Sequence, residues 1–285
     1  MKIKRIWQVY FSPCGGTRKI VSAMASNLKS ELDLADVESS IYDFTLPANR
    51  QSFPSLASDD LVVFGCPTYA GRLPNLLLPY LNSINGNGAF AVPIVSFGNR
   101  NFDNSLAELS SLLTDKSFRV IGAGAFATEH VFSKVLGKGR PDTKDFREID
   151  DFAKCICQKM VKSLNSDVGL ANHPHLFFPS FHVDGCADGP YFRPQDSAGN
   201  FIDIRKVKPL TRDVCTSCGL CAEICPMGSI DWDDFSKIKG VCIKCCACVR
   251  QCPQKAKFFD DPGFLTHKED LEKKFIRNSK NSFFY

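Results

Sequence analysis

The feature that most limits the possible folds is a pair of closely spaced cysteine runs near the end of the chain. Nine of the 14 cysteines in the 285-residue sequence lie between Cys215 and Cys252. The runs read CTSCGLCAEICP and CIKCCACVRQCP, and each has the form C-x2-C-x2-C-x3-C-P. The second run is therefore an internal repeat of the first. In a reducing compartment such a local cluster predicts metal ligands rather than disulfides.

The spacing within each run predicts iron–sulfur clusters. Three thiolates at steps of three residues can wrap one corner of a cubane, and the fourth, before a proline, is turned toward the other cluster. Pro226 and Pro253 end the short helices there. The predicted ligands of two [4Fe–4S] clusters are Cys215, Cys218, Cys221 and Cys252 for the first, and Cys242, Cys245, Cys248 and Cys225 for the second.

Two points about this module stay open at the level of sequence. The alternative to iron–sulfur clusters is a pair of zinc sites, although zinc sites favour C-x2-C pairs separated by longer gaps and often include histidine. Cys246 is an additional cysteine beside Cys245, and we predict that it is not a ligand.

The module resembles the bacterial two-cluster ferredoxins over about 50 residues, because all eight ligands and both prolines match that family's pattern. The resemblance implies low-potential, one-electron chemistry in a small α+β domain, residues 207–262. Lysines and aspartates around the ligands nearly balance, so no strong field would steer a partner toward it.

The first 165 residues alternate short apolar runs with amphipathic stretches. This alternation predicts an α/β fold, a doubly wound parallel sheet of five strands with helices on both faces. The expected strands are 3–11, 37–44, 61–66, 89–97 and 120–128, and the expected helices are 17–32, 75–84, 105–114 and 145–163.

The turn after the first predicted strand opens a helix and is rich in small and polar residues. Backbone amides and hydroxyls at a helix N-terminus form a phosphate site. The turn, Ser12–Arg18, resembles the flavodoxin phosphate loop, [ST]-x-T-G-x-T, at Ser12, Gly15 and Thr17. Cys14 replaces the threonine of that loop, so a weak thiol donor stands where the family has a hydroxyl.

Two further loops follow predicted strands, and parallel strands in the order 2-1-3-4-5 bring all three loops to one ligand crevice. We expect Tyr69 and Phe102 to supply flat faces, and Gly71, Gly98 and Asn99 to let the backbone approach a ring edge. The predicted FMN-binding residues are Ser12, Pro13, Cys14, Gly15, Gly16, Thr17, Thr68, Tyr69, Ala70, Gly71, Gly98, Asn99, Arg100, Phe102 and Asp103.

Taken together, the chain resembles the flavodoxin–ferredoxin fusion proteins, which implies non-covalent FMN beside two clusters. Four parts are expected: a flavodoxin-like domain (1–165), an aromatic-rich connector packed on the domains (166–206), the ferredoxin domain (207–262) and a tail helix (263–285). We interpret His173, His175, His182 and Cys186 of the connector as loop residues rather than metal ligands. His130, just past the fifth strand, is expected near the crevice or at the surface.

These features predict an electron-transfer protein that passes single electrons between the clusters and FMN, with redox proteins as partners. One alternative is a reductase that delivers the electrons to a small molecule, for which a closed pocket over the flavin would be evidence. A redox or iron sensor that acts by protein binding is the second alternative. No catalytic residue or dinucleotide fingerprint is recognised.

Charge and hydropathy exclude some binding partners and cellular locations for such a protein. The net charge of +4 is too small to indicate nucleic acid, and no apolar stretch is long enough to span a membrane. The start of the chain lacks a secretory cleavage pattern, so a cytoplasmic location is expected.

Overall fold

The computed structural model describes residues 3–165, 183–196 and 198–285. Its main feature is a seven-stranded sheet with the order β2-β1-β3-β4-β6-β9, in which β5 also pairs with β4. All pairings are parallel except that of β9 with β6. The strands are β1 (Arg5–Tyr10), β2 (Glu38–Asp43), β3 (Asp60–Pro67), β4 (Phe90–Phe97), β5 (Arg119–Val120), β6 (Ala123–Ala127) and β9 (Ser282–Phe284).

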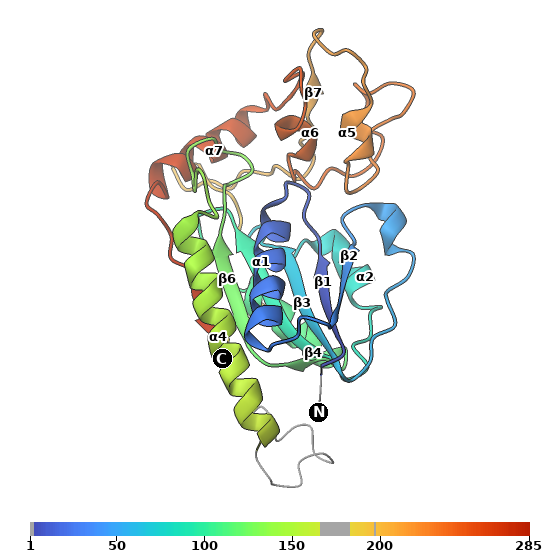
Figure 1. Ribbon diagram of the computed structural model, residues 1–285. Helices are drawn as coiled ribbons and strands as arrows, with labels where there is room; N and C mark the ends of the chain where they lie inside the picture. The colour runs from blue at the N-terminus through green and yellow to red at the C-terminus, as the bar shows by residue number, and fades with distance from the viewer. Residues whose placement is uncertain (1–2, 166–182, 197) are drawn as a thin grey trace.

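Helices cover both faces of this sheet, as the alternating pattern predicts (Figure 1). One face packs against α1 (Gly16–Glu31) and α4 (Thr143–Asn165). The other carries α2 (Leu78–Leu81), which follows a 3₁₀ turn at Asn75–Leu77, and α3 (Ser105–Asp115). A further 3₁₀ turn spans Pro47–Arg50.

The central strands explain the fold best, because β3 and β4 are buried along nearly their whole length. Their continuous apolar sequences are what a parallel strand covered on both faces requires. In α1 the buried residues Ile20, Met24 and Leu28 recur every four positions and form the stripe that faces the sheet. The flavodoxin-like, doubly wound fold class is confirmed.

The predicted fifth strand, 120–128, is divided into β5 and β6. Both pieces pair with β4, at Phe90–Ala91 and at Ile94–Phe97. The break lies at Ile121 and Gly122, where a Cβ on Gly122 would come within 2.1 Å of the Ile156 side chain of α4. Close packing of α4 against the chain accompanies the interruption.

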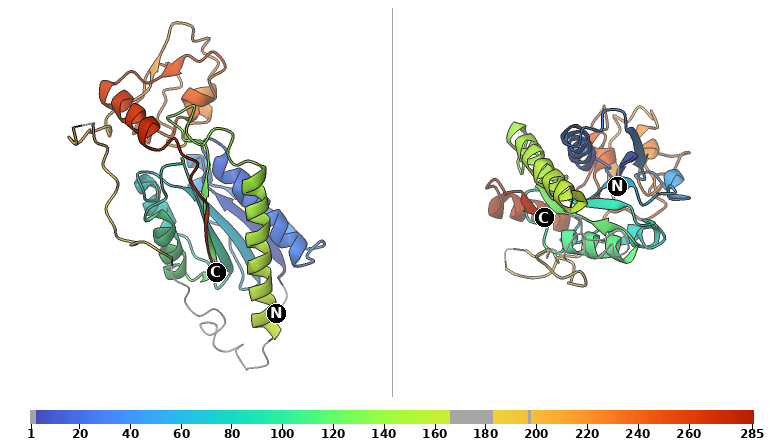
Figure 2. Two further views of the ribbon diagram at one scale, coloured as in Figure 1. Left: turned by 90° about the vertical axis from the view of Figure 1, so that its left-hand side faces the viewer. Right: turned by 60° about the horizontal axis from the view of Figure 1, so that its bottom comes forward.

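The prediction of a tail helix over residues 263–285 is only partly right. Helix α7 covers Pro262–Lys274, and the chain then runs back along the sheet and adds β9 beside β6 (Figure 2). Phe283 packs against Phe126 and Phe152, with ring centroids 5.3 and 5.1 Å away. The last residues therefore belong to the N-terminal sheet, because they cover apolar side chains of that domain.

The cysteine module lies over the carboxyl ends of the parallel strands (Figure 1). A two-stranded sheet holds it together, with β7 (Leu210–Thr211) antiparallel to β8 (Lys257–Phe258). Each cysteine run contains one short helix, α5 (Leu220–Glu223) in the first and α6 (Ala247–Arg250) in the second.

The described part of the connector packs on the N-terminal domain, as expected. The Tyr191 hydroxyl donates to the Leu73 carbonyl at 2.9 Å, and the Phe192 amide donates to the Ala70 carbonyl at 2.8 Å. Residues 166–182, which include Phe177, Phe178, Phe181, His173, His175 and His182, lie outside the described residues.

Within the described ranges, no helix has both the length and the apolar character needed to cross a bilayer.

Candidate functional site

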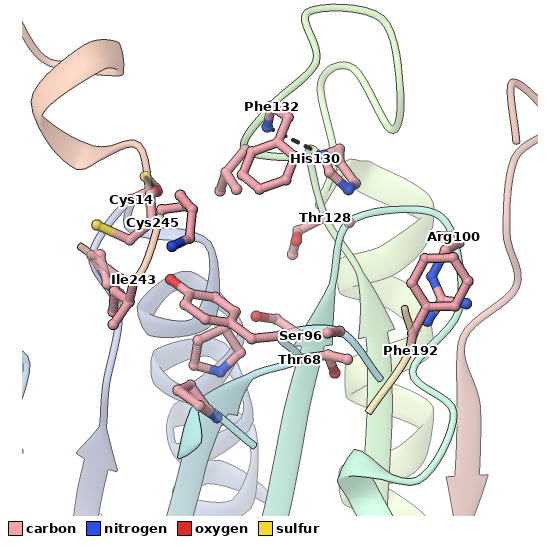
Figure 3. A pocket seen from close by; sticks show the side chains of 18 of the residues that line it. Cys14, Thr68, Ser96, Arg100, Thr128, His130, Phe132, Phe192, Ile243 and Cys245 are labelled. Atoms are coloured by element: carbon pink, nitrogen blue, oxygen red, sulfur yellow. Dashed lines mark hydrogen bonds between the residues drawn. The ribbon is translucent and has the colours of Figure 1, made fainter. Parts of the chain in front are cut away.

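A cavity of about 900 Å³ lies between the carboxyl ends of the strands and the cysteine module (Figure 3). The three predicted loops form its floor, and its wall includes the loop after β6 and parts of the module, the connector and α7. The predicted FMN residues that line it are Ser12, Pro13, Cys14, Gly16, Thr17, Thr68, Tyr69, Ala70, Gly98 and Arg100.

The first loop has the form of an anion cradle at the start of α1. Gly15 adopts a left-handed conformation (φ 83°) and caps the helix. The Arg18 amide donates to the Ser12 hydroxyl at 3.0 Å, which closes the loop. The Thr17 hydroxyl lies 2.8 Å from that of Ser96, in a buried pair that lines the cavity. Hydroxyls beside a 16-residue helix's N-terminus fit a phosphate group.

Cys14 makes a contact that the sequence did not indicate. Its thiol donates to the backbone carbonyl of Cys245, a predicted cluster ligand, at 3.1 Å. Burial raises the pKa of this thiol to about 11, so it keeps its proton near neutral pH. The residue that replaces the phosphate-loop threonine thus joins the N-terminal domain to the cysteine module.

Five predicted FMN residues do not line the cavity, namely Gly15, Gly71, Asn99, Phe102 and Asp103. Phe102 was expected to offer a ring face, but it packs against Phe97 with ring centroids 5.6 Å apart. Asp103 pairs with Arg100. Gly71 has a left-handed φ of 77°, and a Cβ there would lie 2.3 Å from the Asp103 carboxylate. These residues support the conformation of the loops and do not line the cavity.

Asn99 has a different role from the expected approach to a ring edge. It is completely buried, and its amide nitrogen donates to the carbonyls of Phe275 and Arg277 at 2.8 and 2.7 Å. Its side-chain oxygen accepts the Ser279 amide at 3.1 Å. Asn99 therefore anchors the segment between α7 and β9, a contact between residues about 180 positions apart.

Several cavity residues were not predicted. His130 and Phe132 come from the loop after β6, Phe192 from the connector and His267 from α7. For His130, the sequence had left open whether it lies near the crevice or at the surface. The other three carry no local signal, because aromatic residues in loops and helices pack in many ways.

Both histidines are poor bases in this setting. Burial, together with the nearby imidazole of His267 and the positive charge of Arg100, lowers the pKa of His130 to about 4. Burial likewise lowers the pKa of His267 to about 4. Near pH 7 both imidazoles are neutral.

Two smaller cavities lie inside the cysteine module. One is lined by Cys215, Cys218, Cys221 and Cys252, and the other by Cys225, Cys242, Cys245, Cys246 and Cys248. Each cavity is thus lined by one of the two predicted ligand sets, and the second cavity is also lined by Cys246. Over the described ranges, no three His, Cys, Asp or Glu side chains form a group that could hold a single metal ion.

Backbone amides point at four of these sulfur atoms, in equivalent positions of the two repeats. Ser217 and Lys244 donate to the Sγ atoms of Cys215 and Cys242, each at 3.4 Å. The last cysteines of the runs also accept amides, Cys225 from Ser229 at 3.4 Å and Cys252 from Ala256 at 3.2 Å. Such N–H···S bonds favour thiolates and tune cluster potentials, so the site fits iron–sulfur clusters.

Cys246 occupies the position that Gly219 has in the first repeat. Both residues have left-handed φ values, 59° and 79°, and both precede the short helix of their run. The Cys246 side chain is buried, and its thiol lies 3.5 Å from the Lys244 carbonyl oxygen. Its left-handed start of α6 matches a helix-capping position, consistent with the prediction that it is not a ligand.

Comparison with known proteins supports the assignment of the module. Residues 210–231 match the family model for the 4Fe-4S binding domain, a range that contains the whole first cysteine run. A comparison with curated proteins finds no match.

Solved structures that resemble the chain include flavodoxins. A flavodoxin of Streptococcus pneumonia TIGR4 is 16% identical, with 54% of this chain and 99% of that chain covered and a TM-score of 0.38. Flavodoxin 1 of Bacillus cereus is also 16% identical, covering 54% and 97%, with a TM-score of 0.35. Rubredoxin oxygen:oxidoreductase of Desulfovibrio gigas is 16% identical, covering 58% and 38%, with a TM-score of 0.39.

The sheet order and the 4Fe-4S match together decide the organisation of the chain. The chain joins a flavodoxin-like, doubly wound sheet to a 4Fe-4S binding domain. These two domains are docked by several contacts besides Cys14. Arg250 pairs with Glu129, Gln251 donates to the Pro13 carbonyl at 3.0 Å, and Arg50 donates to the Pro226 carbonyl.

Proposed function

We propose that this protein transfers electrons between two [4Fe–4S] clusters in its ferredoxin domain and an FMN in the large cavity. The cluster farther from the large cavity, called the outer cluster, would be held by Cys215, Cys218, Cys221 and Cys252. The inner cluster would be held by Cys225, Cys242, Cys245 and Cys248. The phosphate of FMN would lie at the Ser12–Thr17 loop. A bound flavin accepts one or two electrons, so it couples one-electron carriers to two-electron chemistry.

One observation carries this proposal. Cys242 and Cys245 line the second small cavity and also the large one, so the inner ligand set adjoins the proposed flavin site. Cys218 of the other set is exposed, and the exposed Trp232 lies near the adjacent Gly219. The arrangement supports a path from a redox partner through the outer cluster and the inner cluster to the flavin.

The shape of the large cavity favours the reductase over a simple carrier. A carrier flavodoxin needs only an exposed ring edge, whereas here the connector, the ferredoxin domain and α7 also line the site. About 900 Å³ lies near the upper end of the range for small-molecule pockets. We therefore propose as a second function that the protein reduces a small molecule held beside the flavin.

The experiment is an analysis of anaerobically purified protein for iron, sulfide and flavin, followed by stopped-flow reduction with dithionite. We expect about eight irons per chain, one FMN, and flavin reduction that follows cluster bleaching. Zinc in place of iron, or a flavin that never receives electrons from reduced clusters, would contradict the proposal and leave only a sensor.

A pair of cysteine variants sharpens this test. Cys225→Ala should remove the inner cluster's signal, lower the iron content by about half and stop flavin reduction. Cys246→Ser, the matched control, should keep both clusters. Selective loss of the outer cluster in Cys225→Ala would show that the crossed ligand sets are wrong.

A further inference from the structure

One end of the large cavity is built mostly by residues outside the predicted FMN loops. Figure 3 shows His130, Phe132, Arg100 and Phe192 on one side of the cavity and Cys14 on the other. His267 of α7 also lines the cavity, and its ring lies 6.2 and 6.4 Å from those of Phe192 and Phe132. We call the group of Arg100, His130, Phe132, Phe192 and His267 the His130–His267 pocket.

The walls of this pocket are flat and largely apolar. The rings of His130 and Phe132 meet edge to face, with centroids 5.2 Å apart. The guanidinium of Arg100 lies 4.2 Å from the ring centroid of Phe192. Aromatic faces arranged in this way favour a flat ligand with an apolar body.

Contacts outside the pocket hold these walls in place. The Phe192 amide is bonded to the Ala70 carbonyl, beside the second flavin loop. Phe132 packs against Phe264 of α7 with ring centroids 4.7 Å apart. A Cβ at Gly98 would lie only 2.6 Å from the His130 ring, so the loop after β4 supports that ring directly. The pocket is therefore preorganised.

The two imidazoles give the pocket its hydrogen-bonding character. The Phe132 amide donates to His130 Nδ1 at 3.2 Å, so the proton of this neutral ring is on Nε2, which is a donor. His267 is 5% exposed, and its Nδ1 is buried with no hydrogen-bond partner among the described residues. That nitrogen is closed off from the cavity, whereas His130 Nε2 makes no hydrogen bond to the described residues and is not fully buried, so it is the imidazole donor that a ligand can reach.

Charge is balanced at this end of the cavity. Arg100 is paired with Asp103, and burial keeps both imidazoles neutral near pH 7. A carboxylate or phosphate would have to leave water without gaining an unpaired cation from these residues, which disfavours an anionic ligand.

We propose that the His130–His267 pocket is the substrate site, and that it takes a small, uncharged, flat molecule with a carbonyl group. The aromatic walls hold the body of this molecule, and His130 Nε2 donates to its carbonyl oxygen. The assignment rests on the proposed function, in which FMN occupies the remainder of the same cavity.

Three probes of similar size test this assignment on the oxidised protein with its cofactors bound. Acetophenone has the flat body and the carbonyl, benzoate has a charge instead, and ethylbenzene lacks the polar group. Calorimetric titration and flavin difference spectra should show acetophenone binding at least about tenfold more tightly than either of the others. Equal or tighter binding of benzoate would overturn the proposal.

Variants then connect the binding to the pocket. His130→Phe keeps a ring but removes the Nε2 donor, and should raise the Kd of acetophenone about tenfold. Lys273→Gln, on the exposed side of α7, is the control and should leave the Kd unchanged. Unchanged acetophenone binding in His130→Phe would contradict the proposal.

A second variant covers the case in which His130→Phe does not fold. Phe192 is 36% exposed, so Phe192→Leu should fold normally and weaken the binding of acetophenone and ethylbenzene alike. Wild-type affinity in Phe192→Leu would also count against the pocket. Flavin content, iron content and flavin reduction are measured in the same samples. Normal values together with failed probe binding would refute the substrate site alone, whereas absent cofactors would refute the proposed function.

Discussion

Cys14 and Thr17 lie in one short loop and yet serve different partners. Thr17 keeps its hydroxyl in the cavity beside Ser96, where an FMN phosphate would gain a donor. Cys14 directs its hydrogen bond across the domain boundary to Cys245. Of these two neighbouring side chains, the Thr17 hydroxyl is available to a cofactor and the Cys14 thiol makes a contact between domains.

Thr17→Val should weaken FMN binding by about 1.5–3 kcal/mol, because it preserves shape but removes a hydroxyl that would bond a charged phosphate. Fluorescence titration of the released flavin measures the effect. Thr114→Val is the control, since its hydroxyl bonds the Ser110 carbonyl within α3. Unchanged FMN affinity in Thr17→Val would mean that the phosphate lies elsewhere.

Cys14→Ala should leave FMN affinity within about threefold of the wild type and lower the free energy of unfolding by about 0.5–1.5 kcal/mol, since a bond to the Cys245 carbonyl is lost. Urea unfolding and flavin titration test both parts. Cys186→Ala, at an exposed position, is the control. A fall in FMN affinity as large as that of Thr17→Val would show that the thiol serves the phosphate instead.

The element that most changes the domain description is β9. It adds an antiparallel strand to a sheet that is otherwise parallel, and it does so from the far end of the chain. Asn99 holds the approach to β9, and Asn281 accepts the Ala127 amide at 2.8 Å. The tail therefore ties the ferredoxin domain to the flavodoxin-like sheet from outside the cavity.

Truncation after Asn281 should lower the free energy of unfolding by about 2–4 kcal/mol, because it uncovers the apolar rings that Phe283 contacts. Urea unfolding of the protein with its cofactors bound measures this loss. Removal of Tyr285 alone is the control, since that residue is 57% exposed and contributes less. Equal stability of the two truncated proteins would show that β9 packs only weakly.

At the scale of the whole molecule, the flavin cavity exists only where the two domains and the tail meet. Its wall contains two imidazoles whose pKa values are lowered to about 4. The unfolded chain binds protons at these positions near pH 6.5, and the folded chain does not. The contribution of the two neutral imidazoles to the free energy of unfolding is thus fully present above about pH 6.5. It is lost as the pH falls toward 4.

The wild-type protein should therefore lose stability between pH 7.5 and 5.5, and His267→Phe should lose less over the same range. One fewer titrating group reduces the slope by up to about 1.4 kcal/mol per pH unit. Urea unfolding at several pH values measures the slopes, with Lys273→Gln as the control. The same slope in His267→Phe and wild type would show that His267 is not buried as a neutral group.

Much of the fold could be predicted because its signals are local. The buried runs of β3 and β4 follow from their continuous apolar sequences, and the 4Fe-4S binding domain follows from its cysteine spacing. Phe102 and Asn99 were misplaced, because a loop residue's direction depends on what packs behind it. Here Phe97 and the tail segment hold the two side chains away from the cavity.

The order of short apolar and amphipathic segments was enough to determine a doubly wound sheet, and the repeated cysteine spacing was enough to determine a 4Fe-4S module. Both are readable from residues close in sequence, because apolar periodicity and cysteine spacing are local patterns, although the strands themselves pair over longer distances, as Arg5 does with Asp60. Only the tertiary structure decided that β9 completes the sheet, that Cys14 contacts Cys245, and that His130 and His267 share a pocket. These contacts join residues more than a hundred positions apart, and no local pattern encodes them.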